Sequence, residues 1–229
     1  METAQDSTQG VATRSIAICG PIAAGKTTFA KYLAAYTPPN FGIPAFVVAE
    51  PVDMEALTDM YTGKSAVSEF QYAFLNAYES VAEYIGAKNY TGDSVAILDG
   101  SIFDCVMYNK TREVCGDITT DELEALQAHA AEILERQPLT RPSEVLYFPP
   151  PPLEEQRARI QRRGRECEQG LLAPGNTFLE TLNEVYATQF APLLECYDIT
   201  CYQMPLLPYS PAGQSGLTAY LRGVLSQLN

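Results

Sequence analysis

The sequence has few basic residues and no long apolar run, and both absences exclude broad classes of protein. Only 15 of its 229 residues are Lys or Arg against 28 Asp and Glu, and the net charge of −13 disfavours a nucleic-acid polymer as partner. No apolar run approaches the roughly 20 residues that cross a bilayer, and the polar N-terminus lacks the features of a signal or transit peptide. We therefore expect a soluble, intracellular protein that acts without a membrane.

The sequence also has little histidine and lacks the cysteine spacings that are typical of metal sites. The six cysteines include no C-x-x-C pair, and the closest two, Cys196 and Cys201, have no histidine beside them to complete a zinc site. We interpret the cysteines as reduced thiols rather than as a disulfide framework. The single histidine, His129, lies in a polar segment with a helical pattern, which favours a surface position over the activation of a nucleophile.

What the sequence does contain is a regular alternation of two patterns. Short apolar, β-rich runs occupy 15–19, 45–49, 95–99, 144–148 and 200–204, and helical patterns cover 26–36, 66–88, 120–136, 153–166, 177–196 and 213–228. Such alternation predicts the α/β class, with a doubly wound parallel sheet of five strands and helices on both faces. No repeat or low-complexity tract interrupts it, so we expect a flexible tail over 1–14 followed by one domain over 15–229.

The segment GPIAAGKTT directly follows the first apolar run and fits the phosphate-binding pattern G-x-x-x-x-G-K-[ST]. Glycines let backbone N–H groups turn toward phosphate oxygens, and the N-terminus of the following helix adds the positive end of its dipole. In this pattern Lys26 reaches the outer phosphates, and the Thr27 hydroxyl joins the shell of a Mg²⁺ ion. We predict that the loop binds ATP through Gly20, Pro21, Ile22, Ala23, Ala24, Gly25, Lys26, Thr27 and Thr28.

Two acidic residues end the second and third strands of the predicted sheet. The carboxyl ends of strands in open α/β sheets face the ligand crevice, so we expect Glu50 and Asp99 beside the phosphate loop. Asp99 is the candidate for a second magnesium-binding group. Glu50 taken alone is equally well explained as a helix cap or as a surface acid.

A third of all Lys and Arg residues lies in the nine positions 157–165. On a helix, Arg159 and Arg163 are four residues apart and share one face. Mobile arginines that close over a triphosphate supply positive charge to the transition state of phosphoryl transfer. The alternative is a solvated charged helix face that pairs with nearby glutamates.

The order and spacing of these motifs resemble the deoxynucleoside kinase family, which includes cellular enzymes and the herpesviral thymidine kinases. The resemblance runs from about Ser15 to the C-terminus through GPIAAGKTT, EPV (50–52), FQYAF (70–74), LDGSIF (98–103), RIQRRGRECEQG (159–170) and NTFLETLNEVYATQF (176–190). It implies a P-loop kinase fold with an arginine-rich lid over about 157–172. The size of the chain and its departures from the family pattern are similar to those of a diverged, viral thymidine kinase.

The resemblance also implies roles for individual residues. Glu50 matches the carboxylate that takes the proton from the 5′-hydroxyl of the nucleoside, and Asp99 matches the carboxylate that organises the metal ion. The residues implied around the transferred phosphoryl group are Lys26, Arg159, Arg163 and Arg165.

On the nucleoside side, the resemblance implies a pocket built around an amide. Gln71 matches the glutamine whose paired donor and acceptor read the base edge, in thymine directly or in cytosine after an amide flip. Tyr61 matches the tyrosine that holds the sugar 3′-hydroxyl together with Glu168 of the lid. Phe74 and Phe103 are candidates to pack on the base, although filling the core explains either ring equally well.

Two departures from the family pattern lie close to the sugar. Gly100 stands where the family has an arginine near the acceptor oxygen, and Lys64 and Arg112 are candidates to supply that charge. Glu55 stands where a tryptophan usually lies beside the sugar. The sugar and base selectivity of the family therefore cannot be transferred as a whole.

Two further departures bear on the base. Tyr78 and Cys105 stand where cytosine-preferring members have an arginine and an aspartate, which favours thymidine or broad pyrimidine use. The resulting hypothesis is a thymidine kinase that transfers the γ-phosphate of ATP, with Mg²⁺, to the 5′-hydroxyl of thymidine or of other pyrimidine deoxynucleosides.

Two alternatives stay open. A nucleoside-monophosphate (thymidylate-like) kinase would need a basic pocket for the acceptor's phosphate, and 50–100 holds only Lys64 and Lys88. An ATP-binding regulatory protein would phosphorylate no small molecule. The resemblance further implies a homodimer that packs through helices such as 66–88 and 120–136, where Leu75, Val81 and Leu123 are expected on the surface.

Overall fold

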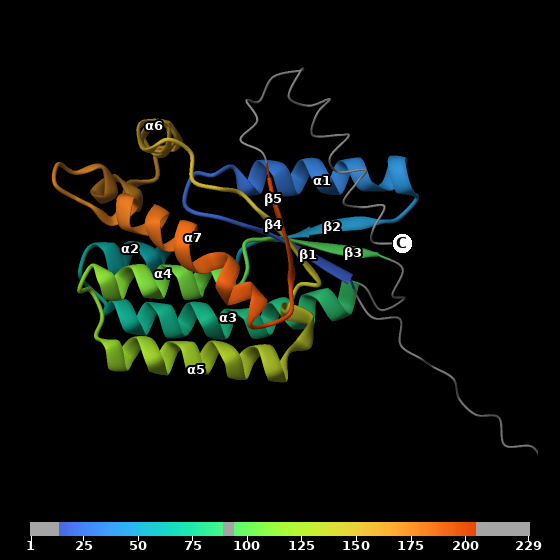
Figure 1. The fold of residues 1–229 in the computed structure, drawn as a ribbon, viewed down its shortest axis with the longest axis horizontal. Helices are drawn as coiled ribbons and strands as arrows, with labels where there is room; N and C mark the ends of the chain where they lie inside the picture. The colour runs from blue at the N-terminus through green and yellow to red at the C-terminus, as the bar shows by residue number, and fades with distance from the viewer. Residues whose placement is uncertain (1–13, 89–93, 205–229) are drawn as a thin grey trace, which may run out of the picture.

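A computed structural model describes residues 14–88 and 94–204, and these form one parallel sheet with helices on both sides (Figure 1). The strands are β1 (Arg14–Cys19), β2 (Ala45–Val48), β3 (Val95–Asp99), β4 (Glu144–Tyr147) and β5 (Thr200–Gln203). Their order is β2-β3-β1-β4-β5, and every neighbouring pair is parallel. The predicted five-stranded, doubly wound α/β fold is confirmed.

The central strands β1 and β3 are mostly apolar because both of their faces are covered. All of Val95–Asp99 and all of β1 after Arg14 are buried, as expected for parallel strands between two layers of helices. Ile18 of β1 is in register with Asp99 of β3, so both strands end at the same edge of the sheet. This edge carries the functional site.

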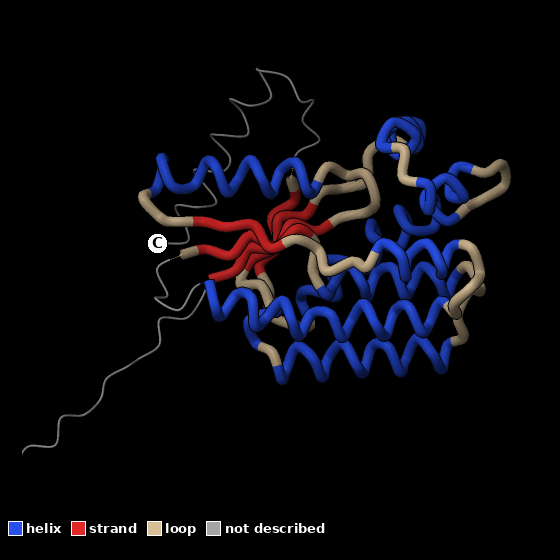
Figure 2. Tube along the Cα trace, turned by 180° about the vertical axis from the view of Figure 1, so that it is seen from behind, coloured by secondary structure: helices blue, strands red, loops and turns tan. Residues whose placement is uncertain are grey.

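The two faces of the sheet are covered unequally (Figures 1 and 2). In the described residues one face carries α1 (Lys26–Phe41), whose Phe29 and Leu33 pack on the outer side of β1 and β3. The opposite face carries α3 (Val67–Lys88), α4 (Ile102–Val114), α5 (Thr120–Arg136) and α7 (Phe178–Glu195). The smaller elements are α2 (Met54–Tyr61), η1 (Pro138–Thr140), α6 (Leu153–Arg163) and η2 (Glu166–Leu172).

Two helices were missing from the sequence-based expectation. The short α2 begins at the N-cap Asp53, whose carboxylate accepts from the N–H groups of Glu55 and Ala56. The α4 helix begins with a capping box between Ser101 and Asp104 and is buried on nearly every side. Its buried surface includes polar residues such as Asn109 and Thr111, and the capping box was the signal that could have located the helix.

Several predicted boundaries also differ, and the helix expected over 26–36 continues to Phe41. The expected helix over 153–166 ends at Arg163, because Gly164 adopts a left-handed conformation with φ 67° and terminates α6. Arg14, expected in the N-terminal tail, is the first residue of β1. The rest of that tail and the helix expected over 213–228 lie outside the described residues.

The apolar residues expected at a dimer surface are placed differently. Leu75 is fully buried and Val81 is 6% exposed, because α3 packs between α5 and the sheet-facing core. Only Leu123 keeps partial exposure. His129 on α5 bonds to Asn76 of α3 through Nε2 at 2.7 Å. Across the described part of the chain, no helix combines the length and the apolar character that a bilayer crossing requires.

Candidate active site

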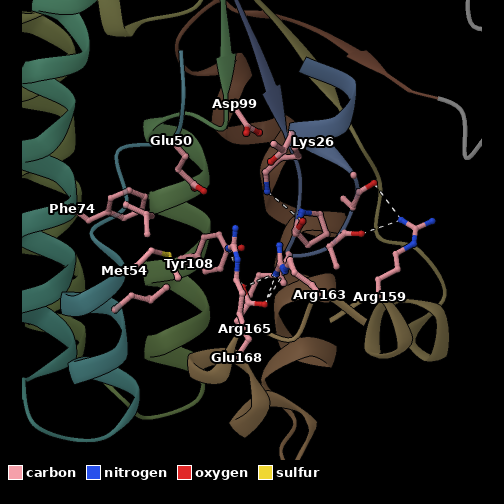
Figure 3. Close-up of a pocket in the computed structure, with 18 of the residues that line it drawn as sticks. Lys26, Glu50, Met54, Phe74, Asp99, Tyr108, Arg159, Arg163, Arg165 and Glu168 are labelled. Atoms are coloured by element: carbon pink, nitrogen blue, oxygen red, sulfur yellow. Dashed lines mark hydrogen bonds and ion pairs between the residues drawn. The ribbon is translucent and has the colours of Figure 1, made fainter. Parts of the chain in front are cut away.

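A cavity of about 830 Å³ lies at the carboxyl edge of the sheet and brings together residues that are far apart in the sequence (Figure 3). The phosphate loop and the α6–η2 segment form one wall. The other wall comes from the ends of β2 and β3 and from α2, α3 and α4. Ligand sites of α/β sheets are expected at this edge.

The phosphate loop has the backbone that its glycines allow. Gly20 has φ 147°, and a Cβ there would meet the carbonyl oxygen of Phe148 at 2.4 Å, so no other residue fits without movement. Gly25 is the left-handed N-cap of α1, with φ 104°. Lys26 donates from Nζ to the carbonyl oxygens of Gly20 and Pro21, at 2.5 and 3.3 Å. Pro21 through Thr28 line the cavity, whereas Gly20 lies behind its surface.

Glu50 and Asp99 both reach the cavity from the strand ends, beside Lys26 (Figure 3). Burial raises the pKa of the partly exposed Glu50 to about 7, and the charges of Asp104 and Asp99 act in the same direction. Lys26, and more weakly Arg165, oppose this rise in the pKa. A carboxylate with a pKa near neutrality is suited to accept a proton.

Gly100 is explained by the crowding around it. Its φ is +86°, and an added Cβ would lie 3.2 Å from Oε1 of Glu50 and 3.3 Å from Oδ2 of Asp104. The space where a side chain at position 100 would lie is therefore taken by two carboxyl groups and not by a cation. Of the two residues considered as a replacement, Lys64 is exposed, pairs with Asp59 at 3.0 Å and does not line the cavity.

Arg112 does reach the cavity, from the C-terminal half of α4. Its guanidinium lies over the rings of Tyr61 and Phe178, at 5.1 and 4.3 Å from their centroids. Nη1 bonds to Asp117 at 2.7 Å. Burial raises the pKa of Tyr61, and Arg112 opposes that rise. The sequence indicated Arg112 only as one candidate for the charge missing at Gly100, because no local pattern shows that its side chain contacts Tyr61.

The arginines of the lid segment divide between two partners. Arg163 makes a bidentate contact with Glu168 at 3.0 and 2.5 Å, and Arg165 pairs with the same carboxylate at 3.4 Å. Arg159 donates to the carbonyl oxygen of Ala23 in the phosphate loop at 3.0 Å and pairs with Glu155. All three line the cavity. The arginines therefore pair with glutamates, as the second alternative predicted, and they also line the cavity that contains the phosphate loop.

The wall opposite the lid is mostly apolar, with one amide. Gln71 is 3% exposed, and its Oε1 has no hydrogen-bond partner within the described part of the chain. Phe70 and Phe74 lie beside it along α3, with their ring centroids 5.9 Å apart. A buried amide oxygen without a partner is costly, and because Gln71 lines the cavity, a donor on a bound ligand would satisfy this oxygen.

One residue predicted to contact the nucleoside does not reach the cavity. Phe103 is fully buried and packs edge-on against Tyr197, just after α7, with the ring centroids 5.2 Å apart. Of its two readings, core filling is correct. Tyr78 and Cys105 are likewise buried behind the cavity wall and do not line it.

The oxygen donors of the site suit a hard cation. Thr27 and Asp99 line the cavity near Lys26, and hydroxyl and carboxylate oxygens are the ligands that Mg²⁺ accepts. Residues 14–88 and 94–204 contain no group of three or more His, Cys, Asp or Glu residues arranged to hold a metal alone. An ion here would share its shell with nucleotide phosphates and water, as Mg²⁺ commonly does.

A phosphate loop after β1, strand-end carboxylates and arginines facing that loop define a P-loop nucleotide kinase. The family model described as deoxynucleoside kinase matches residues 16–205, and the chain belongs to this family. It is thus a phosphotransferase of the deoxynucleoside kinase type. No curated protein sequence matches the chain.

Solved structures show the same fold. Deoxyadenosine kinase from M. mycoides with bound dATP superposes with a TM-score of 0.65 at 20% identity, covering 91% of this chain and 99% of that one. The dCTP-bound structure gives a TM-score of 0.64 at 20% identity with the same coverage. The structure with products dCMP and dCDP gives 0.62 at 19% identity, over 92% and 99% of the chains.

Proposed function

We propose that this kinase is a thymidine kinase, which transfers the γ-phosphate of ATP to the 5′-hydroxyl of thymidine and accepts other pyrimidine deoxynucleosides. The observation that carries the proposal is the unpartnered Oε1 of Gln71 in an apolar wall. Thymine offers N3–H to this oxygen and O4 to the amide N–H, so both halves of the amide are satisfied. A site with a buried, directional amide discriminates strongly against ligands that leave it unpaired.

Two side chains behind the cavity wall support the choice of thymine over cytosine. Tyr78 and Cys105 are buried and uncharged at the positions where cytosine-preferring relatives place a charged pair. Burial raises the pKa of both groups well above their ordinary values, so both stay neutral. The base would therefore be selected by Gln71 and by the fit of apolar rings such as Phe74.

The reaction follows from the placement of charge in the cavity. Glu50 orients the 5′-hydroxyl and accepts its proton as the oxygen attacks in line. Lys26 leaves the loop carbonyls for the β- and γ-phosphates, and the arginines of the lid stabilise charge on the transferred group. Mg²⁺ held with Thr27 and Asp99 would neutralise phosphate charge. Arg163 acts in this way only if the phosphates compete with Glu168 for its guanidinium.

The sugar would be held at the junction of the two walls. Tyr61 and Glu168 both line the cavity, and the proposal places the 3′-hydroxyl between them. Arg112 stacks on Tyr61 and fixes the orientation of its ring. We also propose that the protein is a homodimer, to be checked by sedimentation or light scattering.

A panel of acceptors with labelled ATP and Mg²⁺ tests the proposal. We expect the highest kcat/KM with thymidine, lower values with deoxycytidine, and the lowest with purine deoxynucleosides. Preference for a purine deoxynucleoside would contradict the assignment to thymidine while leaving the family untouched.

The same panel separates the alternatives. Thymidylate as the best acceptor would indicate a monophosphate kinase. Among the described residues of the wall opposite the lid, Arg112 is the single cation, and it forms an ion pair with Asp117. This pairing disfavours binding of an acceptor phosphate, which a monophosphate kinase requires. ATP loss that no acceptor changes would indicate a regulatory protein.

A further inference from the structure

Among the described residues, the mechanism above leaves one fully buried carboxyl group unused. Asp104, the third residue of α4, is 0% exposed and does not line the cavity. Three groups donate hydrogen bonds to its carboxylate. These are the N–H of Gly20 at 3.0 Å, the N–H of Ser101 at 3.1 Å and the hydroxyl of Tyr186 at 2.6 Å.

The site requires a carboxylate rather than an amide. All three partners are donors, and an ionised carboxylate is the common side chain that only accepts. An asparagine of the same shape would turn an NH₂ group toward at least one donor. The nearby charge of Lys26 and the three hydrogen bonds oppose the rise that burial causes in the pKa of Asp104.

The two oxygens of Asp104 serve different elements. Oδ2 completes the capping box of α4 with Ser101. Oδ1 joins two segments that are distant in sequence, the start of the phosphate loop at Gly20 and the helix after the lid at Tyr186. Tyr186 is itself fixed by Tyr147, whose ring stacks on it with an interplanar angle of 5°.

A second capping box in the chain shows that capping alone does not need this arrangement. At the start of α5, Oε2 of Glu122 bonds to the N–H and hydroxyl of Thr119. Glu122 and Thr119 are part of an ordinary surface cap, close to Glu113 and Thr120. Of these two capping residues, Asp104 is the one that also contacts the phosphate loop and α7.

Both backbone polar groups of Gly20 form hydrogen bonds with side chains. Its N–H donates to Asp104, and its carbonyl oxygen accepts from Nζ of Lys26. Its Cα faces the backbone of Phe148, which leaves no room for rearrangement in that direction. The first residue of the loop thus sets where the following N–H groups and Lys26 stand.

We propose that Asp104 is a positioning residue for the phosphate donor: held by Tyr186, it fixes Gly20 and so orders the phosphate loop for ATP. Its contribution to turnover rests on the proposed function. Its contribution to ATP binding does not, because that step needs no nucleoside. Both can be measured separately.

The test compares Asp104→Asn with the matched cap variant Glu122→Gln. Charge-assisted hydrogen bonds correspond to about a tenfold to hundredfold change. We expect Asp104→Asn to weaken binding of a non-hydrolysable ATP analogue, and to raise KM for ATP, by about tenfold or more. The KM for thymidine should change less than about twofold, and Glu122→Gln should bind the analogue like the parent protein.

Tyr186→Phe tests the same network with less disturbance of the fold. It keeps the ring beside Tyr147 and removes the hydroxyl, so we expect about a threefold weaker analogue affinity. If Asp104→Asn fails to fold, this variant decides. Analogue affinity within about 1.5-fold of the parent in Tyr186→Phe, or an equal rise in both KM values in Asp104→Asn, would overturn the proposal. If the variants bind the analogue more weakly but the parent protein phosphorylates no nucleoside, only the proposed function is overturned.

Discussion

The two walls of the cavity are built in opposite ways. The donor wall consists of the phosphate loop, Pro21 to Thr28, and the lid arginines Arg159, Arg163 and Arg165. It is rich in charge and backbone N–H groups. The acceptor wall consists of residues from α2, α3 and α4 and is apolar except for a few groups, of which Gln71 is the central one. In the proposed function, the first wall would bind phosphate through charge, and the second would bind a base through shape and a single amide.

Glu50 stands where the two walls meet, so its substitution should break the connection between them. We expect Glu50→Gln to lower kcat by about 10²- to 10⁴-fold, the usual contribution of a general base. Affinity for an ATP analogue should stay unchanged, because Glu50 faces the acceptor. Steady-state kinetics and analogue titration measure both quantities, and full turnover at saturating thymidine would refute the role.

Glu50→Gln should also stabilise the free protein at neutral pH. The folded-state pKa of about 7 lies above the ordinary value of 4.5, so ionisation of Glu50 opposes folding as the pH rises through this window. Removing the charge should raise Tm by a few degrees, measured by calorimetry at pH 8. At pH 4 the two proteins should unfold at similar temperatures.

On the donor wall, Arg163→Ala is the sharpest single change. We expect kcat to fall by about 100-fold or more, since arginines that stabilise transferred phosphoryl groups commonly contribute this much, with a smaller loss of nucleoside affinity. Arg157→Ala is the matched control on the same helix, because Arg157 pairs with Glu180 outside the cavity. Equal effects of both variants would show that only the charge of the helix matters.

On the acceptor wall, Gln71→Leu should affect the nucleoside and not ATP. Loss of the amide leaves the base edge unpaired, and we expect kcat/KM for thymidine to fall about 30-fold while KM for ATP is maintained. Gln189→Leu is the control, since Gln189 bonds to Lys110 away from the cavity. A rise in KM for ATP would show that the two walls are not separate.

The smallest expected effect is that of pH. Because the base form of Glu50 exists above its pKa of about 7, activity should fall as the pH decreases through 7. Between pH 8 and pH 6 we expect kcat/KM for thymidine to decrease about tenfold. An acidic limb near pH 4.5 instead would show that Glu50 is not desolvated in the working enzyme.

The sequence predicted the donor wall far better than the acceptor wall. GPIAAGKTT is one contiguous segment whose glycines dictate its backbone, and the strand-end acids Glu50 and Asp99 follow from the period of the strands. The acceptor wall depends on how helices rotate against one another. Phe103 was expected near the base and lies in the core, and Leu75 and Val81 were expected on the surface and are buried.

The sequence alone determined the α/β class, the order of strands and helices that it detected, and the phosphate loop, because each depends on local periodicity or on backbone conformation. The tertiary structure decided which side chains meet across the chain. It brought Arg112 onto Tyr61, Arg159 onto the carbonyl oxygen of Ala23, and Asp104 between Gly20 and Tyr186. Such contacts depend on how distant segments pack against one another, and the local pattern of residues does not reveal this packing.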